Sequence, residues 1–487
     1  MKMVKLILPF IFGVIGIIGF APYSIKICIY LSYIYLIFLI LFSKKSVFIK
    51  IFMWGLGHWG FGMSWIIVSI YYYGETSIAL SLTIYIILTI ILSLVFTSPL
   101  IIIKKILPIL KIENNFLKIS SVSALMLASE FTRYYFLNGV PWLIPGNIYL
   151  DTLTQNIYPF FGVSFASLII YFLCTAILIS YKKNRRFLFI LVTLAVFTLV
   201  PEKKIDNLDG DIKVSVIQPS SDPFLKYEKN YHEDIENNLI DLINSTPPDT
   251  QLIVLPEAEL PYYLQDIRFT HFINKIDHKE KILMGVWNLD QLSYLTYNSI
   301  YSVNTSEIYD KIHLVPFGEY IPFIGLRGLI DFFDLPMSNV SHGLSYQENI
   351  KIFDNMEIST PICFDISFPE TIRRMNKTSL FIVNISNDTW FGDSIGPAQH
   401  LSIARVRAIE NNRWLVRSTN DGYSAIIANN GTIVSYLDKK DRNILNGNIN
   451  LINKRSFYNK IGFSSTYVIL FLVIITSLIN FIRTKKR

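Results

Sequence analysis

The chain has little charge and almost no cysteine. Charged residues make up 17% of its 487 positions, whereas an average soluble domain carries about 25%. It has three cysteines, and two of them, Cys28 and Cys174, lie in long apolar runs. Three scattered cysteines exclude a disulfide framework and a CxxC metal pair, so no metal site is expected. Cys363 is therefore the one thiol in the polar part of the chain.

The shortage of charge is uneven along the chain. Residues 1–200 are mostly Ile, Leu, Phe and Tyr, whereas residues 205–460 have the composition of a soluble domain long enough to bury a core. The net charge of +7 is concentrated in short clusters beside apolar runs. That placement is typical of membrane topology signals, so we expect a membrane partner and no nucleic acid.

Long apolar stretches predict a bundle of membrane helices. A bilayer core needs about 20 apolar residues per helix. Eight stretches meet this need, at residues 5–21, 26–43, 50–72, 77–103, 119–138, 157–181, 186–200 and 465–482. The fifth contains Glu130 and Arg133, and the seventh is short, so these two are the weakest predictions. The first has no convincing small-residue cleavage site and is interpreted as an uncleaved helix.

The loops between these stretches alternate in charge. The segments SKKSVFIK, KKILPILKIENNFLK, YKKNRR and RTKKR are basic, whereas YYYGETS and NGVPWLIPGNIYLDTLTQN contain no Lys or Arg. Because basic loops stay in the cytoplasm, both termini are predicted to be cytoplasmic. The predicted organisation is thus a seven-helix bundle over 1–200, an extracytoplasmic domain over 205–460 and a last membrane helix over 465–482.

The soluble domain alternates short β-branched runs with polar helices. Helices are predicted at 227–246 and 396–412. Strands or hairpins are predicted at 211–219, 250–257, 281–287, 297–316, 351–364, 379–386, 413–419 and 423–437. This alternation indicates an α/β sandwich.

Three polar residues lie beside predicted strands and could share a cleft. They are Glu257 after LIVLP, Lys311 in YDKIHLVP and Cys363 after ISTPI. A thiol needs a base, since its free pKa is about 8.5, and a glutamate in a dry cleft can serve. A lysine and the backbone N–H of Phe364 could hold the oxyanion that forms when a thiolate attacks a carbonyl.

Each of these residues also has a structural interpretation. A lone cysteine is more often buried and inert, and a lone Glu or Lys usually faces solvent. Glu319 and Asp365 could likewise be partners of the backbone or of Lys. His342, the nearest histidine to Cys363 in the sequence, lies in a loop-like SHG segment with nothing that marks it as a base.

Four motifs resemble those of the apolipoprotein N-acyltransferases of Gram-negative bacteria. They are LPEAELP, DKIHLVPFGEYIP, PICFDISFPE and the long segment that starts at NISNDTWFGD. The N-terminal segments GFAPYS, GHWGFGMSWIIVSI and EFTRYYFLNGVPWLIPGN extend the similarity over almost the whole chain. The resemblance implies a nitrilase-like αββα sandwich on a membrane bundle of eight helices.

The resemblance also implies roles for individual residues. It assigns a catalytic triad to Glu257, Lys311 and Cys363, and a supporting role to Glu319. The family usually has Cys-Tyr-Glu where this chain has Cys363 followed by Phe and Asp, so Phe364 and Asp365 become supporting residues of the site. Substrate contacts are implied for two aromatic residues, Tyr227 and Trp390.

The implied reaction is acyl transfer without a cofactor. A phospholipid donates the acyl chain, and the α-amine of a diacylglyceryl-cysteine at a lipoprotein N-terminus accepts it. The resemblance implies a monomer in the inner membrane with its catalytic domain in the periplasm. Two alternatives are a membrane-anchored nitrilase-type amidase and a transporter or receptor with a degenerate outer domain. Few ionisable residues in the predicted spans argue against transport.

Overall fold

The computed structural model describes residues 4–73, 77–181, 185–202, 210–222, 225–316, 318–320 and 340–486. Its contacts divide the chain into two compact units. The first is built from Met1–Ile67, Ser77–Lys203 and Ile461–Arg487, and the second from Val68–Thr76 and Lys204–Lys460. Parts of two predicted loops, residues 74–76 and 182–184, lie outside the described residues.

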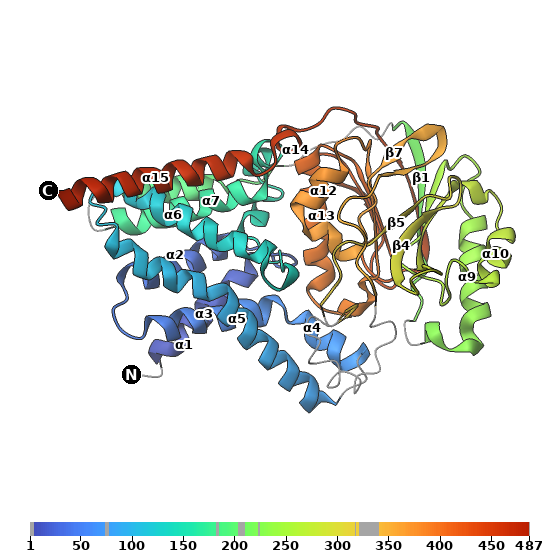
Figure 1. Ribbon diagram of the computed structural model, residues 1–487, viewed down its shortest axis with the longest axis horizontal. Helices are drawn as coiled ribbons and strands as arrows, with labels where there is room; N and C mark the ends of the chain where they lie inside the picture. Colours follow the sequence, from blue (N-terminus) through green and yellow to red (C-terminus); the bar gives the residue numbers. More distant parts are fainter. Residues whose placement is uncertain are drawn as a thin grey trace. The chain divides into compact units, whose positions relative to one another are not determined.

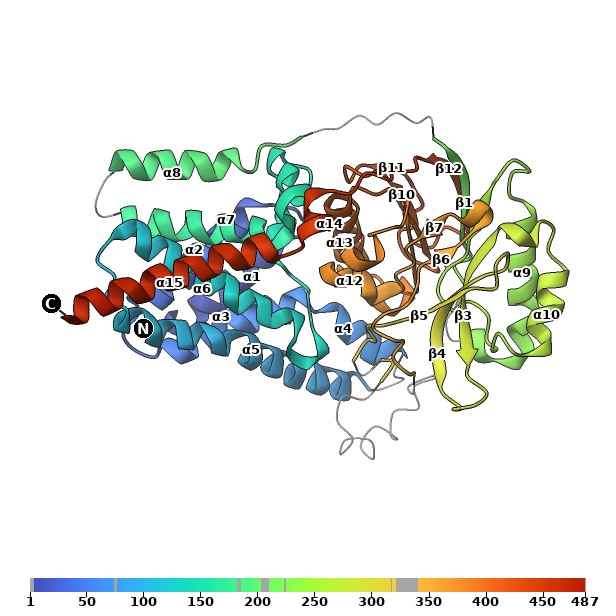
Figure 2. The ribbon, with the colours of Figure 1, turned by 45° about the horizontal axis from the view of Figure 1, so that its top comes forward.

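The first unit consists of helices, and each predicted apolar stretch contains one (Figures 1 and 2). These helices are α1 (Val4–Ile18), α2 (Ile27–Phe42), α3 (Val47–Gly62), α4 (Trp65–Val68), α5 (Ile78–Ile109), α6 (Asn115–Phe131), α7 (Tyr158–Ser180), α8 (Arg185–Phe197) and α15 (Ser464–Lys486). Within the described ranges, three segments are long and apolar enough to cross a membrane, namely Ile78–Ile109, Leu153–Ser180 and Ser464–Arg483. A fourth qualifies if α3 and α4 form one bent span.

The eight predicted spans are therefore confirmed as apolar helices but not all as membrane-length helices. Helices α1 and α2 have 15 and 16 residues. At 1.5 Å per residue they extend about 22–24 Å, which is less than the hydrocarbon core of about 30 Å. Apolar composition predicted the positions of these helices but not their lengths.

The prediction of continuous helices over 50–72 and over 119–138 was wrong. Helix α3 ends at Gly62, and α4 is bent from it by 55°. A π-helical turn, η1 (Ser69–Tyr73), follows α4. Helix α6 ends at Phe131, where a 3₁₀ turn begins. Residues on both sides of each break are largely apolar, so hydropathy could not reveal where the helices end.

The described part of the second unit contains a six-stranded sheet, a four-stranded sheet and a two-stranded ribbon. The larger sheet has the strand order β12-β1-β2-β3-β4-β5, and the smaller has β11-β10-β9-β8. Their bounds are β1 (Ile212–Gln218), β2 (Leu252–Val254), β3 (Ile282–Leu289), β4 (Thr296–Ser302), β5 (Ile308–Asp310), β8 (Ile382–Ser386), β9 (Leu415–Thr419), β10 (Ala425–Ile427), β11 (Ile433–Tyr436) and β12 (Asn443–Ile449). Strands β6 (Ile350–Lys351) and β7 (Glu357–Ile358) form the ribbon. Strand β12 was not predicted, and it pairs antiparallel with β1 along its full length.

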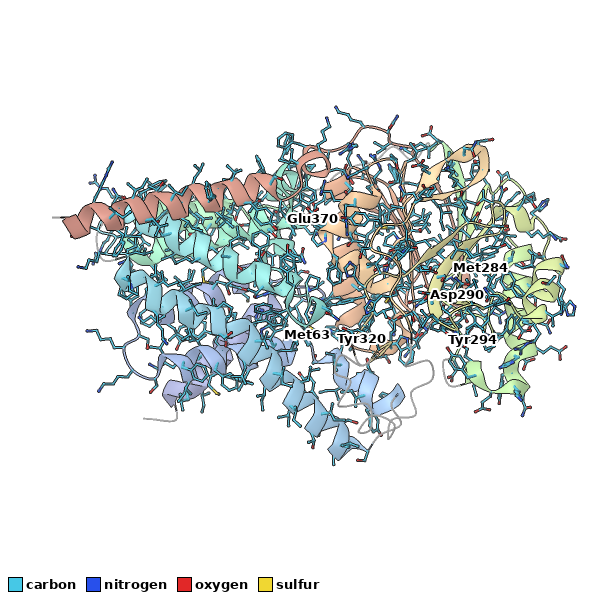
Figure 3. All side chains as sticks on the ribbon, in the orientation of Figure 1. Met63, Met284, Asp290, Tyr294, Tyr320 and Glu370 are labelled. Atoms are coloured by element: carbon cyan, nitrogen blue, oxygen red, sulfur yellow. The ribbon has the colours of Figure 1, made fainter. Side chains whose placement is uncertain are left out.

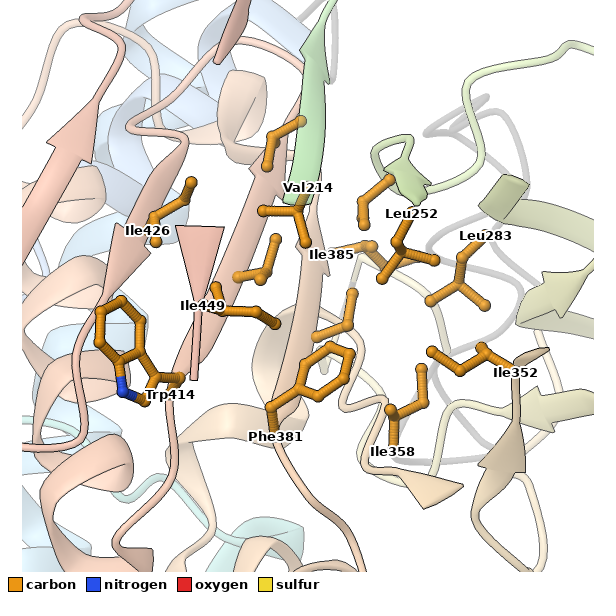
Figure 4. Close-up of a cluster of buried hydrophobic side chains, with 14 of the residues drawn as sticks. Val214, Leu252, Leu283, Ile352, Ile358, Phe381, Ile385, Trp414, Ile426 and Ile449 are labelled. Carbon is orange, nitrogen blue, oxygen red and sulfur yellow. The ribbon is translucent and has the colours of Figure 1, made fainter. Parts of the chain in front are cut away.

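Alternation along the buried strands builds two cores on opposite faces of the larger sheet. Val214 of β1 and Leu252 of β2 lie in the core shared with Ile385 and Ile426 of the smaller sheet (Figure 4). Their neighbour Ile253 belongs to the second core instead. Since successive side chains of a strand point to opposite faces, both faces of this sheet are buried.

Helices cover the outer faces of both sheets. Helices α9 (His232–Asn244) and α10 (Ile267–Asn274) contribute Leu239 and Phe272 to the second core, against Met284 of β3. Helices α12 (Pro369–Met375) and α13 (Gly396–Asn411) lie on the opposite side of the sheets (Figure 1). The unit is thus a helix–sheet–sheet–helix sandwich. Met284 lies inside it, whereas Tyr294, at the β3–β4 turn, is exposed (Figure 3).

One glycine lets strand β3 approach the loop that carries Glu257. A Cβ on Gly285 would lie 2.5 Å from the Ala258 nitrogen and 2.7 Å from the Glu257 Cα. Because both atoms belong to the backbone, they cannot move away as a side chain can.

We therefore expect Gly285→Ala to lower the free energy of unfolding of this unit by about 1–3 kcal/mol and to displace Glu257. Thermal unfolding followed by near-UV circular dichroism measures the loss. Gly318→Ala is the control, because its Cβ would meet Val315 Cγ1 at an ordinary 3.5 Å. Equal stability of the two variants would contradict this expectation.

Candidate active site

Strands β2, β4 and β5 of the larger sheet bring three polar residues together. Glu257 lies three residues after β2, Lys311 directly follows β5, and Asn298 is within β4. All three are buried, and Lys311 is 1% exposed. These strands thus place an amide, a carboxylate and an ammonium together in one buried site.

The ammonium of Lys311 lies between two carboxylates. Its Nζ is 3.0 Å from Oε1 of Glu257 and 2.9 Å from Oε1 of Glu319. The second oxygen of Glu319 accepts a hydrogen bond from the Val315 backbone N–H at 2.8 Å. A buried charge is tolerated only when it is paired and hydrogen-bonded, and this arrangement meets both conditions.

Burial and charge act in opposite directions on Lys311. Burial alone lowers the pKa of its ammonium, but the thiolate form of Cys363 and the carboxylates of Glu257 and Glu319 raise that pKa well above its ordinary value. The side chain is therefore a fixed cation at neutral pH. It can stabilise negative charge on an oxygen atom without first taking up a proton.

Two asparagines contact Glu257: Asn387 belongs to the quoted motif NISNDTWFGD, whereas Asn298 lies outside all the quoted motifs. The Asn298 amide Nδ2 donates to Oε1 of Glu257 at 2.6 Å and to Oε1 of Glu319 at 3.0 Å. The backbone N–H of Asn387 donates to Oε2 of Glu257 at 2.7 Å. Every group around the Glu257 carboxylate is a donor, so the carboxylate is held in place as an acceptor.

Cys363 lies at a sharp turn where the chain leaves the sheets. It begins the 3₁₀ turn η11 (Cys363–Ser367) and has a φ of +45°, the left-handed region that non-glycine residues rarely adopt. Burial raises the pKa of its thiol, the charge of Glu257 raises it further, and Lys311 opposes them. The resting group is a protonated thiol, which needs a base before it can act as a nucleophile.

Asp365 joins the segment that carries Lys311 to the turn that carries Cys363. Its buried carboxylate accepts hydrogen bonds from the His313 N–H at 2.7 Å, the Tyr309 hydroxyl at 3.0 Å and the Ile362 N–H at 3.2 Å. Burial raises its pKa to about 6, and the His313 N–H opposes this rise. Three hydrogen bonds to this one carboxylate thus restrict how far the two segments can move apart.

The remaining predicted residues lie next to groups that contact Glu257. Half-buried Tyr227 follows Lys226, whose ammonium donates to the Ala258 carbonyl. Half-buried Trp390 is in the turn η12 (Asp388–Phe391), which begins one residue after Asn387. Tyr227 is thus one residue from the lysine that bonds to Ala258, and Trp390 is three residues from Asn387, which bonds to Glu257.

Phe364 is half-buried and packs edge-on against Phe368, with ring centroids 5.2 Å apart. The Phe368 ring stacks on His313 at 3.5 Å. Burial and the charge of Arg374 lower the pKa of His313 to about 3, so this imidazole is neutral. His342 bonds through Nδ1 to the carbonyl of Ile312 at 3.0 Å.

Comparison with known proteins covers both units. Residues 12–176 match the family Apolipoprotein N-acyltransferase N-terminal domain, and residues 213–457 match the Carbon-nitrogen hydrolase family. The chain is 32% identical to the apolipoprotein N-acyltransferase of Pasteurella multocida, over 87% of this chain and 85% of the relative. It is 29% identical to that of Haemophilus influenzae, over 98% and 95% of the two chains.

The chain belongs to the apolipoprotein N-acyltransferase family. A third relative from this family, in Wigglesworthia glossinidia brevipalpis, is 30% identical over 89% of this chain. The resemblance inferred from the sequence motifs is thereby confirmed. In this member of the acyltransferase family, Asn298 is the polar residue that the motifs missed, since it stands alone in the strand TYNSIYS.

We expect Asn298→Ala to slow acylation of Cys363 by a larger factor than a loss of folding stability alone would cause. The change leaves two buried carboxylates with one donor fewer, and a hydrogen bond to a charged group is worth about 1.5–3 kcal/mol. The expected loss is roughly 10–150-fold in the single-turnover rate.

The matched control is Asn376→Ala, which removes another fully buried amide, one that bonds to the Ile372 carbonyl. It should lower stability and leave the acylation rate within about twofold of the rate of the unaltered protein. Equal acylation rates in the two variants would remove Asn298 from the site.

Proposed function

We propose that the protein is an apolipoprotein N-acyltransferase that acts through a thioester on Cys363. The observation that carries the proposal is the buried Lys311 ammonium, 3.0 Å from Glu257, on a segment that Asp365 connects by hydrogen bonds to the Cys363 turn. It occurs in a chain that matches the family's membrane domain as well as its hydrolase-like domain.

The first half-reaction transfers an acyl chain from a phospholipid to the enzyme. Glu257 takes the proton from Sγ of Cys363, and the sulfur attacks the carbonyl carbon of the acyl ester. Negative charge develops on the carbonyl oxygen, where Lys311 and the Phe364 N–H stabilise it. The carbon–oxygen bond to the glycerol then breaks, Glu257 returns its proton to the leaving oxygen, and lysophospholipid departs.

The second half-reaction uses an amine in place of the glycerol oxygen. The neutral α-amine of a diacylglyceryl-cysteine attacks the thioester carbon, and the same donors stabilise the oxyanion. The carbon–sulfur bond breaks and an amide forms. Glu257 accepts the proton that the amine loses and passes it to the thiolate, which restores the starting enzyme.

The membrane unit favours this function over the alternative of a membrane-anchored amidase. An amidase of small soluble amides would use the same three residues with water as the acceptor. It would not need a partner domain rich in long apolar helices such as α5. Both lipid substrates, in contrast, keep their acyl chains in the bilayer, where these chains avoid contact with water.

Incubation of the purified protein with phospholipid should produce an acyl adduct on Cys363. Mass spectrometry of the intact protein and of its peptides detects the adduct. A lipoprotein peptide with a free α-amine should then remove it. A diacylglyceryl peptide with an acetylated α-amine should leave it in place.

Two cysteine variants serve as controls. Cys363→Ala should carry no adduct, and Cys174→Ala, in a buried position of α7, should carry it like the unaltered protein. An adduct that persists in Cys363→Ala, or one that water removes as fast as the peptide amine does, would overturn the proposal.

We propose further that the helices span the inner membrane eight times and leave residues 205–460 in the periplasm. The alternation of basic and neutral loops supports this orientation. The periplasm is also where a domain can receive exported lipoproteins.

Fusions of alkaline phosphatase test the orientation, because this reporter is active only outside the cytoplasm. A fusion after residue 205 should be active, and a fusion after residue 185 should be inactive. Fusions of β-galactosidase at the same two positions should give the opposite pattern. Activity of the phosphatase at 185 and not at 205 would refute the eight-span arrangement.

A further inference from the structure

A second buried ion cluster lies behind Cys363, and the reaction described above does not use it. Asp388, His400 and Arg417 are each at most 1% exposed. Nη2 of Arg417 is 2.7 Å from Oδ2 of Asp388 and 3.0 Å from Nδ1 of His400. Nε2 of His400 is 3.2 Å from the backbone carbonyl oxygen of Cys363.

Charge and hydrogen bonding fix the state of the His400 ring. Burial lowers the pKa of His400, and the neighbouring Arg417 cation lowers it further, so the imidazole is neutral. Nδ1 of His400 lies between a donor and an acceptor, 3.0 Å from Nη2 of Arg417 and 3.1 Å from Oδ1 of Asp388. The carbonyl oxygen of Cys363 can only accept, so Nε2 of His400 carries the proton in that hydrogen bond.

The Arg417 guanidinium is also connected by hydrogen bonds to Pro361, two residues before Cys363. Nη1 of Arg417 donates to Oδ1 of Asn384, and Nδ2 of Asn384 donates to the Pro361 carbonyl at 2.9 Å. Arg417 is thus connected, through one side chain in each direction, to the carbonyl oxygens of Pro361 and Cys363.

This double attachment explains how the turn at Cys363 is maintained. A non-glycine residue in the left-handed region costs of order 1–3 kcal/mol and persists where surrounding contacts hold it. Cys363, with its φ of +45°, is such a residue. Hydrogen bonds to the two carbonyl groups favour this turn over relaxed alternatives.

The direction of one carbonyl group has a chemical consequence. The peptide between Cys363 and Phe364 is planar and trans, so its C=O and N–H point in opposite directions. When His400 binds the carbonyl oxygen, the N–H of Phe364 is turned away from the Asp388–His400–Arg417 cluster. That N–H is the backbone donor assigned to the oxyanion.

We propose that His400 is a positioning residue that aims the Phe364 N–H at the oxyanion by holding the Cys363 carbonyl. Arg417 and Asp388 hold the other ring nitrogen, Nδ1, and so fix the orientation of the imidazole. The inference rests on the proposed function, since it concerns the same thioester.

Three substitutions of His400 distinguish the roles of its two ring nitrogens. His400→Gln places an amide donor near the position of Nε2, His400→Asn places one near Nδ1 only, and His400→Leu provides neither. Removal of an oxyanion donor lowers a rate by about 10²–10³-fold. Single-turnover acylation of Cys363 should fall by that factor in the Leu and Asn variants. It should stay within about tenfold of the unaltered protein in the Gln variant, with phospholipid binding unchanged in all three.

The acylation is measured with phospholipid and, separately, with p-nitrophenyl butyrate, an activated ester that releases a coloured phenolate. The same order of variants with both esters supports the inference. Equal rates in all the variants and the unaltered protein, or an equal loss in Gln, Asn and Leu that follows their melting temperatures, would overturn it. Asn376→Ala provides the stability control.

The activated ester also separates this inference from the proposed function. An unaltered protein that reacts with p-nitrophenyl butyrate and not with phospholipid contradicts the proposed function, and the comparison of variants still decides the role of His400. An unaltered Cys363 that neither ester acylates refutes both.

Discussion

The interaction on which the rest of the site depends is the buried ammonium of Lys311 between Glu257 and Glu319. A lysine that is 1% exposed would be very costly without carboxylates on its flanks. Those carboxylates would in turn repel each other without the cation. The three groups therefore fix one another's positions, and their charges cannot relax into solvent. This rigidity is what electrostatic stabilisation of an oxyanion requires.

The sandwich supplies the dry surroundings for these charges. Both faces of the larger sheet are buried, one against the smaller sheet and one against α9 and α10. Polar residues at the strand ends consequently have few water molecules with which to exchange hydrogen bonds. Backbone N–H groups of Asn387 and Val315 and the Asn298 amide replace that water. Replacement by fixed dipoles holds the Glu257 carboxylate in one geometry.

Two further carboxylates, Asp365 and Asp388, act on the loops and not on the reacting groups. Asp365 ties the Lys311 segment to the Cys363 turn through three donors. Asp388 pairs with Arg417, whose guanidinium connects to the carbonyl groups before and after the thiol. The strained Cys363 turn is thus held from two sides by buried ion and hydrogen-bond networks. In this family member an aspartate, with its shorter side chain, occupies position 365 and still reaches its three partners.

The sequence by itself determined the locations of the apolar helices and of most strands, and it predicted Glu257, Lys311 and Cys363 as the catalytic residues. Composition, period-two patterns and quoted motifs are local properties, and they need no knowledge of distant contacts. Tertiary structure alone decided the break after α3, the pairing of β12 with β1 and the part played by Asn298. Each depends on groups far apart in the chain, as when Glu257, Asn298 and Asn387 meet at hydrogen-bonding distance. The positive φ of Cys363 also depends on distant groups, because a cysteine in the left-handed region is stable only where surrounding side chains hold its peptide groups.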